Sequence, residues 1–215
     1  MKPRIDLGRI YSALFRCFRP RRLRLFYELF GVHGGTRILD LGGGRYFWEL
    51  VLAEGLPVPR VTIVNIHAPP AGAAGFAWVV ADGRRLPFAD LSFDVVFCNS
   101  VIEHLGDSES QRQLAAEIRR VAPRHFVQTP DVRFPIEPHY LAPFLHWLPK
   151  SLQRLGLPFT PRAALETRSA AAWRRYVDHL RPLSPAGMRA LFPASRVMIE
   201  RLLGLPKSIL AVKTD

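Results

Sequence analysis

The sequence predicts an α/β fold built on a mostly parallel sheet, and two observations carry that prediction. Short apolar segments rich in β-branched residues alternate along the chain with segments of helical periodicity. Polar residues stand at or just past the ends of these apolar segments. They would meet at one edge of a parallel sheet, where such sheets bind their ligands. These residues are Asp40, Asn65, Asp82, Asn99 and Thr129.

The expected elements follow from apolar runs and from the glycines and prolines that interrupt them. Residues 5–30 read as one or two helices with a break at Pro20 and a glycine-rich end at 31–35. Strands are expected over 37–41, 61–66, 76–81, 94–99 and 125–129, and helices over 46–54 and 108–121. A last helix ends near 189–192, and 196–203 and 207–212 form a closing antiparallel pair across Gly204.

A glycine run follows the first expected strand: Asp40 is followed by Leu41 and then by Gly42 to Gly44. Glycine lacks a Cβ and adopts positive φ readily, so this turn lets a nucleotide-sized ligand approach the backbone. Such a turn alone is a weak signal. Asp82, the segment 93–97 and the triplet 103–105 (Glu-His-Leu) strengthen it, because they follow in a recognisable order.

This order of motifs resembles the class I S-adenosylmethionine-dependent methyltransferases, specifically the bacterial type 11 group, over residues 36–130. The resemblance implies a Rossmann-like, seven-stranded, mostly parallel sheet with helices on both faces, and S-adenosylmethionine as the cofactor. It implies a single domain over 1–215: an N-terminal helical lid (1–35), a cofactor-binding core (36–130), a cap and acceptor region (131–190) and closing strands (191–215).

The resemblance also implies roles for individual residues. Asp40, Gly42 and Gly44 would hold the amino-acid part of the cofactor, and Asp82 would read the exocyclic amine of adenine. Asn65 stands where the family carries an acid that accepts hydrogen bonds from the ribose hydroxyls. An amide accepts one such bond and donates another, but without the strength that a charge adds.

Two residues depart from the family pattern and leave open an alternative function without catalysis. Asn65 replaces the ribose acid, and Tyr46 stands where the family carries a third glycine. Both fit a non-catalytic module that binds a cofactor or a partner. A dinucleotide-binding dehydrogenase is disfavoured, because its fingerprint needs glycine where Phe47 stands and an acid about 20 residues further on.

The acceptor side is expected after the fourth strand, where the resemblance places the transferred methyl group beside Asn99. His104 is one candidate general base, because an unperturbed histidine titrates near neutrality, and Glu103 is its neighbour. His139 is the competing candidate, with Glu137 close enough in sequence to orient it. The same motif also serves structure in the family, so a purely structural role for His104 stays open.

Several chemistries are disfavoured. Residues 99–102 (Asn-Ser-Val-Ile) lack the Asn/Asp-Pro-Pro-Tyr/Phe motif of adenine and glutamine methylation, and neither Cys17 nor Cys98 has the Pro-Cys context of cytosine C5 methylation. Two cysteines make no disulfide framework. No histidine and cysteine cluster has metal-ligand spacing, so no metal is expected.

The composition is basic: 30 Lys and Arg against 18 Asp and Glu give a net charge of +12 over 215 residues. This charge favours attraction to nucleic acid, anionic lipid or a phosphorylated substrate, or reflects an arginine-rich coding bias. Without a run of about 20 apolar residues or a secretory signal, a cytoplasmic location is expected. Basic N-terminal helices allow peripheral membrane contact.

A proline- and aromatic-rich stretch over 130–161 reads as an inserted cap rather than disorder. Together these patterns predict methyl transfer from S-adenosylmethionine to a small-molecule or lipid- or glycan-linked acceptor, at oxygen. The alternatives are an RNA methyltransferase that uses the basic surface, for which nucleic acid would be the partner, and the non-catalytic module.

Overall fold

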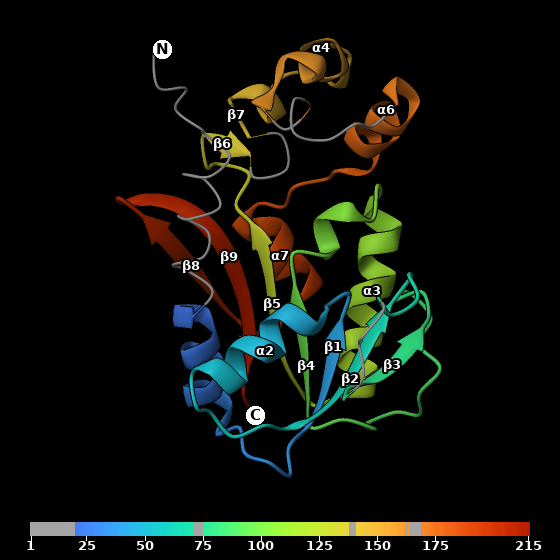
Figure 1. The fold of residues 1–215 in the computed structure, drawn as a ribbon. Coiled ribbons are helices and arrows are strands. Elements are labelled where there is room, and N and C mark those ends of the chain that lie inside the picture. The colour runs from blue at the N-terminus through green and yellow to red at the C-terminus, as the bar shows by residue number, and fades with distance from the viewer. Residues whose placement is uncertain (1–19, 71–74, 138–140, 162, 164–168) are drawn as a thin grey trace, which may run out of the picture.

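The structure is a computed structural model that describes residues 20–70, 75–137, 141–161, 163 and 169–215. One seven-stranded sheet runs in the order β3-β2-β1-β4-β5-β9-β8 (Figure 1). The five strands β1 to β5 are parallel, and β9 and β8 close the sheet antiparallel. The bounds are β1 Arg37–Leu41, β2 Arg60–Asn65, β3 Ala77–Val80, β4 Val95–Asn99, β5 Arg124–Pro130, β8 Arg196–Leu202 and β9 Leu205–Lys213. The α/β prediction, the seven strands and the closing pair are confirmed.

The central strands are apolar because the sheet is covered on both faces. Val95 to Cys98 of β4 are all buried, and in β1 Ile38 pairs with Val95 and Leu41 with Cys98. Continuous apolar runs of this kind are typical of parallel strands that have helices on either side. The strand over 37–41 has the expected bounds, and the ends of the other strands differ from the expected ones by at most two residues.

Helices cover both faces of the sheet (Figure 1). The helix over residues 20–30 and α2 (Arg45–Ala53) pack on one face, and α3 (Ser108–Val121) and α7 (Pro185–Leu191) on the other. On the first face, the Phe97 and Phe126 rings stack at 5.5 Å, and Phe26 meets Phe97 edge-on at 5.0 Å. The described part of the expected N-terminal lid is therefore a structural layer of the domain. Residues 1–19 of that lid lie outside the described residues.

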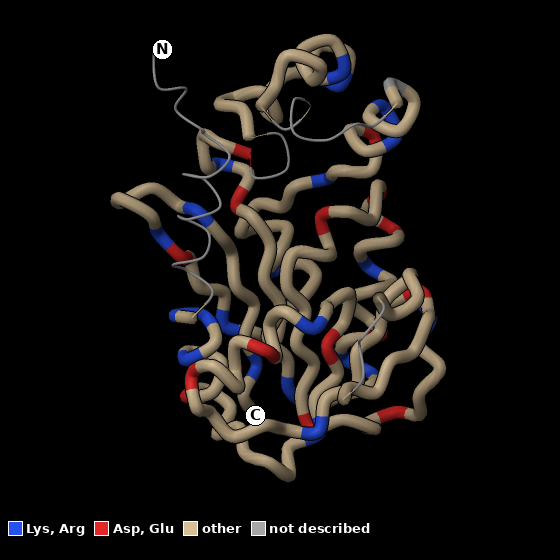
Figure 2. Tube along the Cα trace, viewed as in Figure 1, with Lys and Arg blue, Asp and Glu red and all other residues tan. Residues whose placement is uncertain are grey.

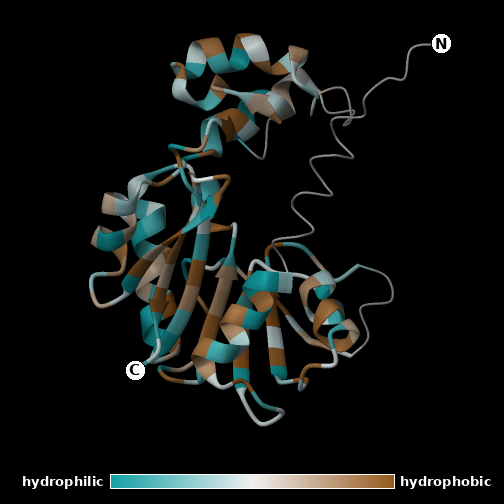
Figure 3. Cartoon of the chain, turned by 90° about the vertical axis from the view of Figure 1, so that its left-hand side faces the viewer, coloured by the Kyte–Doolittle hydropathy of each residue, from teal (hydrophilic) through white to brown (hydrophobic). Residues whose placement is uncertain are grey.

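A cap stands beyond the carboxyl ends of the parallel strands, at the top of Figure 1 and, turned by 90°, at the top of Figure 3. It has its own small core around Leu157, Trp173 and Val177. A two-stranded antiparallel sheet, β6-β7, leads into the cap. The elements of this sheet and of the cap are β6 Ile136–Glu137, β7 Ala142–Pro143, η2 Leu145–Trp147, α4 Lys150–Gly156, η3 Leu157–Phe159 and α6 Ala170–His179.

None of the helices in the described ranges combines the length and the apolar character needed to cross a bilayer.

Candidate functional site

A pocket of about 290 Å³ opens at the carboxyl edge of the sheet, beside the ends of β1, β2, β3 and β4. It brings together Gly42, Asn65, Asp82 and His104, which the sequence analysis placed in one site. Its apolar walls, which sequence reasoning did not single out, include Ile66, Val101 and Leu114. Of the five strand-end residues that were predicted to meet at this edge, Asn65 and Asp82 line the pocket, and Asp40, Asn99 and Thr129 do not.

The glycine loop after β1 is shaped by close packing. Gly42 has φ +74°, and a Cβ there would lie 2.4 Å from a methyl of Val101. A Cβ on Gly43 would lie 1.9 Å from a carboxylate oxygen of Asp40. Gly44 differs, because a Cβ there would meet no protein atom within 4 Å. Gly42 and Gly43 are therefore required by the fold itself, whereas Gly44 leaves open space at the start of α2.

Asp40 lies beneath this loop and does not line the pocket. Its side chain is buried, and its Oδ2 accepts a hydrogen bond of 2.8 Å from Trp48 Nε1. Burial raises the pKa of Asp40 to about 7, although the Trp48 hydrogen bond works in the opposite direction. In this structure Asp40 is thus placed to support the loop from below. Nothing in the sequence indicated Trp48 as its partner.

Asn65, at the end of β2, ties that strand to the glycine loop. Its Nδ2 donates to the carbonyl of Gly43 at 2.9 Å, and its Oδ1 accepts from the backbone N–H of His67 at 3.1 Å. A carboxylate at this position has no donor for the Gly43 carbonyl. The amide therefore makes a contact that the usual acid does not make, and Oδ1 keeps a second lone pair for another donor.

Asp82, just past the end of β3, forms an ion pair with Arg84 at 2.6 Å and also accepts from the Arg84 backbone N–H at 2.9 Å. The side-chain hydrogen bond from Arg84 lowers the pKa of Asp82, so the carboxylate stays ionised. Arg84 in turn donates to Ser110 Oγ of α3 at 3.1 Å. The carboxylate lines the pocket and remains 44% exposed.

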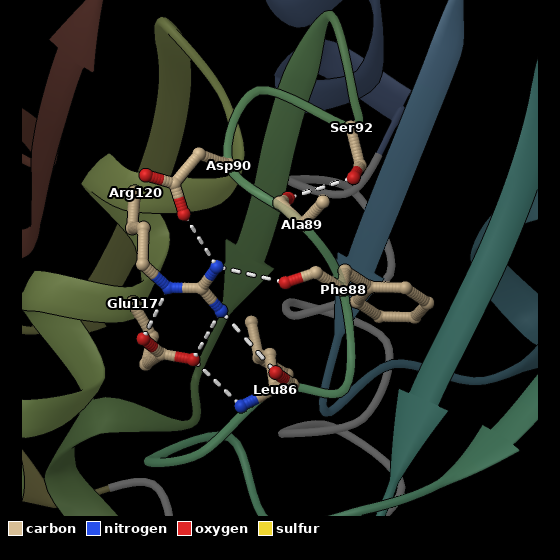
Figure 4. Close-up of polar contacts among 7 residues, drawn as sticks. All are labelled: Leu86, Phe88, Ala89, Asp90, Ser92, Glu117 and Arg120. Carbon is tan, nitrogen blue, oxygen red and sulfur yellow. Dashed lines mark hydrogen bonds and ion pairs between the residues drawn. The ribbon is translucent and has the colours of Figure 1, made fainter.

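The loop that follows Asp82 is clamped to α3 by Arg120 (Figure 4). The guanidinium donates to the carbonyls of Leu86 and Phe88 and to the Asp90 carboxylate, at 3.2, 2.7 and 2.8 Å. Glu117, one turn earlier on α3, pairs with Arg120 and accepts the backbone N–H of Leu86 at 2.6 Å. This clamp was not predicted from the sequence, where the spacing of Glu117 and Arg120 on one helix is the one local signal for it.

His104 is the predicted acceptor-side residue that reaches the pocket. It lies in η1 (Ile102–His104), and its ring centroid is 6.0 Å from that of Tyr176 in α6. The next turn of the chain also contacts the cap, since the N–H of Gly106 donates to the carbonyl of His179 at 2.9 Å. The pocket and the cap therefore meet at His104.

The other two candidate catalytic residues are placed differently. Glu103 is buried: its Oε2 accepts from Thr129 Oγ1 at 2.9 Å, and its carbonyl accepts the N–H of Arg181 at 2.6 Å. It joins β5 to the segment after α6 and does not line the pocket. His139 lies outside the described residues.

Asn99 is held by Arg22 of the N-terminal helix. Arg22 Nη1 donates to Asn99 Oδ1 at 2.8 Å, and Nη2 forms a 2.6 Å ion pair with Glu200 of β8. Asn99 does not line the pocket, whereas the next residue, Ser100, does, with φ +57°. The Arg22 contact spans 77 residues and was not identifiable from local sequence.

Glu200 sits between two cations in this buried cluster. Burial raises its pKa, but the charges of Arg22 and Lys207 outweigh burial and lower the pKa overall. Burial lowers the pKa of Lys207 to about 8. The cluster fixes the helix over 20–30 against the closing strands beside the end of β4.

Part of the chain is similar in sequence to known methyltransferases. Residues 39–124 match a family model described as a methyltransferase domain. An uncharacterised methyltransferase of Mycobacterium sp. (strain JLS) is 42% identical over 81 residues. That match covers 34% of this chain and 31% of the relative, so the chain spans about a third of the relative's length.

Two solved structures share the fold. A S-adenosylmethionine-dependent methyltransferase from Archaeoglobus fulgidus aligns with a TM-score of 0.54 and 19% identity, over 90% of this chain and 92% of that one. The N-terminal domain of EvdMO1, solved with S-adenosylhomocysteine bound, aligns with a TM-score of 0.54 and 20% identity, over 91% of this chain and 80% of that one. At these identities the likeness establishes a Rossmann-like fold.

Proposed function

We propose that this chain, whose residues 39–124 match the model of a methyltransferase domain, transfers a methyl group from S-adenosylmethionine to an acceptor. The observation that carries the proposal is the convergence of the glycine loop, Asn65 and Asp82 on one pocket at the carboxyl edge of the sheet. Open sheets of this kind bind nucleotide-like ligands at that edge.

The residues of the pocket fit the parts of that cofactor. The ionised Asp82 suits the exocyclic amine of adenine, and Asn65 Oδ1 suits a ribose hydroxyl. Ile66 and Leu114 supply apolar surface for the adenine ring. The open space beside Gly44 lies at the N-terminus of α2, where no side chain caps the helix, and backbone amides there favour a carboxylate.

Methyl transfer requires little of the protein beyond alignment of the acceptor with the methyl group of the cofactor. S-adenosylmethionine supplies a methyl group activated on a sulfonium, and transfer is an in-line displacement that needs orientation and exclusion of water. His104 is placed to accept the proton of a hydroxyl acceptor, because it lines the pocket where the cap meets the sheet. A base of this kind supports transfer to oxygen.

The acceptor that we favour is a small molecule or a lipid- or glycan-linked group, since the cap stands next to His104, whose ring centroid lies 6.0 Å from that of Tyr176. RNA is a second candidate, supported by the net charge of +12. A non-catalytic binding module is the third, supported by the engagement of Asn65 with the glycine loop and by Tyr46, which stands half-exposed on α2.

The test is transfer of labelled methyl from S-adenosylmethionine to four pools: phenolic and hydroxylated small molecules, extracted lipids, glycans and RNA. We expect label in one of the first three, lost in His104→Gln with S-adenosylhomocysteine affinity unchanged. His33→Gln, an exposed histidine in the loop before β1, is the matched control and should keep full transfer.

Label in RNA, with salt-sensitive RNA affinity, would select the second candidate. Cofactor binding with no transfer to any pool would select the third. Full transfer by His104→Gln would remove His104 as the base.

A further inference from the structure

The cap carries an exposed apolar stripe that its own core does not use. Leu152, Leu155 and Phe159 follow the spacing i, i+3 and i+7 along α4 and the turn after it, which places them on one side. Leu148 stands just before the helix, in extended backbone. All four are exposed, Leu155 by 69% and Phe159 by 85%. We call these four residues the cap stripe.

Contacts on the other sides of α4 keep the cap stripe exposed to solvent. Gln153, on another side of α4, is buried and donates from Nε2 to the carbonyl of Leu148 at 2.7 Å. Lys150 Nζ donates to the carbonyls of Val177 and Leu180 of the neighbouring segment at 2.6 and 2.7 Å. Leu157 fills the cap core. Rotation of α4 to bury the stripe would break each of these contacts.

Two aromatic residues just before α4 add to the exposed apolar surface. The Phe144 and Trp147 rings lie 5.1 Å apart, and each side chain is about half-exposed. Phe144 has φ +60°, a backbone conformation that is unfavourable for a bulky residue and that the surrounding structure must impose. Trp147 donates its indole N–H to the carbonyl of Val132 at 2.7 Å, so its polar atom is satisfied while the ring faces solvent.

Basic residues accompany the stripe. α4 carries Lys150 and Arg154, and α6, which packs beside it, carries Arg174 and Arg175. Lys150 donates to the two carbonyls named above and Arg154 forms a 2.6 Å ion pair with Asp178, whereas Arg174 and Arg175 are exposed. Figure 2 shows Lys and Arg positions on both helices at the outer end of the cap. Aliphatic and aromatic side chains flanked by cations are what interfacial helices present to anionic lipid.

We propose that the cap docks on an anionic membrane surface, with the cap stripe and Trp147 entering the headgroup region and Arg174 and Arg175 contacting lipid phosphates. A second copy of the chain is the weaker occupant, because it would bring together two molecules that each carry a net charge of +12. RNA bases stack on aromatic rings but offer no counterpart to the three exposed leucines of the stripe. The proposal does not depend on methyl transfer.

Flotation of the full chain with vesicles tests the docking. We expect binding to vesicles that contain phosphatidylglycerol, weak binding to pure phosphatidylcholine vesicles, and partial loss at high salt. The double variant Leu155→Glu/Phe159→Glu should lower the partition coefficient about tenfold or more, because binding scales with buried apolar area. Brominated lipids should quench tryptophan fluorescence of the wild type but not of Trp147→Phe.

The matched control is Leu52→Glu/Leu203→Glu, which makes the same change of charge at two exposed leucines outside the cap. It should bind vesicles nearly as well as the wild type. Equal binding by both double variants would overturn the proposal, since net charge alone would then explain the attachment. So would a wild type that stays off the vesicles, or one that forms a dimer in solution which the cap variant abolishes.

Discussion

Trp48 donates its indole N–H to Asp40 at 2.8 Å, and this contact joins α2 to β1 directly under the glycine loop. Both side chains are buried. A Cβ on Gly43 would collide with the same carboxylate, so Asp40 also limits which residue can stand above it. The base of the candidate cofactor site is thus a buried acid with one indole donor and a pKa raised to about 7.

This raised pKa predicts a pH-dependent stability. The folded protein keeps a proton on Asp40 that the unfolded chain releases above its ordinary carboxyl pKa. The contribution of this group is therefore fully present at acid pH and is lost as pH rises through about 7. We expect Asp40→Asn to raise the unfolding free energy by about 2–4 kcal/mol near pH 8 and to change little near pH 4. Thermal melts across this pH range measure it.

The control variant, Asp94→Asn, should change stability with pH in the opposite direction. Asp94 is bound by Arg37, whose hydrogen bond lowers the pKa of Asp94, so its contribution is lost at acid pH. Asp94→Asn should therefore destabilise at neutral pH and lose its effect as pH falls. Identical pH profiles for Asp40→Asn and wild type would show that the pKa of Asp40 does not differ between the folded and unfolded protein, which would contradict the raised pKa.

We predict that the loop over 84–92 becomes more mobile when the Arg120 clamp is removed. Arg120→Ala removes the donors that hold Leu86, Phe88 and Asp90 to α3 (Figure 4), and it leaves Glu117 without its cation. We expect a loss of about 2 kcal/mol in unfolding free energy and faster amide exchange over 84–92. Denaturant titration and hydrogen exchange report the two effects.

Arg112→Ala is the matched control, because Arg112 pairs with Glu109 at the same spacing on α3 but is exposed and touches no loop carbonyl in the described contacts. Surface pairs of this kind contribute little. If Arg112→Ala loosened residues 84–92 as much as Arg120→Ala, the helix rather than the clamp would be holding the loop.

Alanine substitutions at the neighbouring residues Gly43 and Gly44 should have different effects on stability. Gly43→Ala places a methyl against the Asp40 carboxylate and should destabilise the protein strongly, whereas Gly44→Ala meets no protein atom and should fold as the wild type does. If the open space beside Gly44 receives the cofactor, Gly44→Ala should still weaken S-adenosylhomocysteine binding, by about tenfold. Melting temperatures and calorimetric titration separate the two effects. Unchanged affinity in Gly44→Ala would place the ligand elsewhere.

Local patterns predicted the framework well. The helix over 108–121 was predicted with the bounds that the structure has, since its apolar residues recur at helical spacing, and Asp107 caps it by accepting from the Ser110 N–H. The strands were predicted from short β-branched runs, and their carboxyl ends bring Asn65 and Asp82 to one pocket as expected. These features depend on periodicity within a few residues.

The site contacts were less predictable because they join distant segments. Asn99 was expected at the cofactor, but the structure places Arg22 on its amide, across 77 residues. Asp40 was expected to hold the cofactor, and it lies buried against Trp48 instead of lining the pocket. Glu103 neighbours His104 in sequence, yet it faces Thr129 of β5. Side-chain direction at a strand end depends on the helix packed there, and a single sequence does not specify that packing.

Calorimetric titration with S-adenosylmethionine and S-adenosylhomocysteine tests the central claim most directly, using Asp82→Ala and Arg84→Ala as a pair. Both variants break the same half-exposed ion pair, but only the first removes the carboxylate from the pocket. We predict micromolar binding by the wild type, retained in Arg84→Ala and lost in Asp82→Ala. Absence of binding by the wild type, or equal loss in both variants, would contradict a cofactor site read by Asp82.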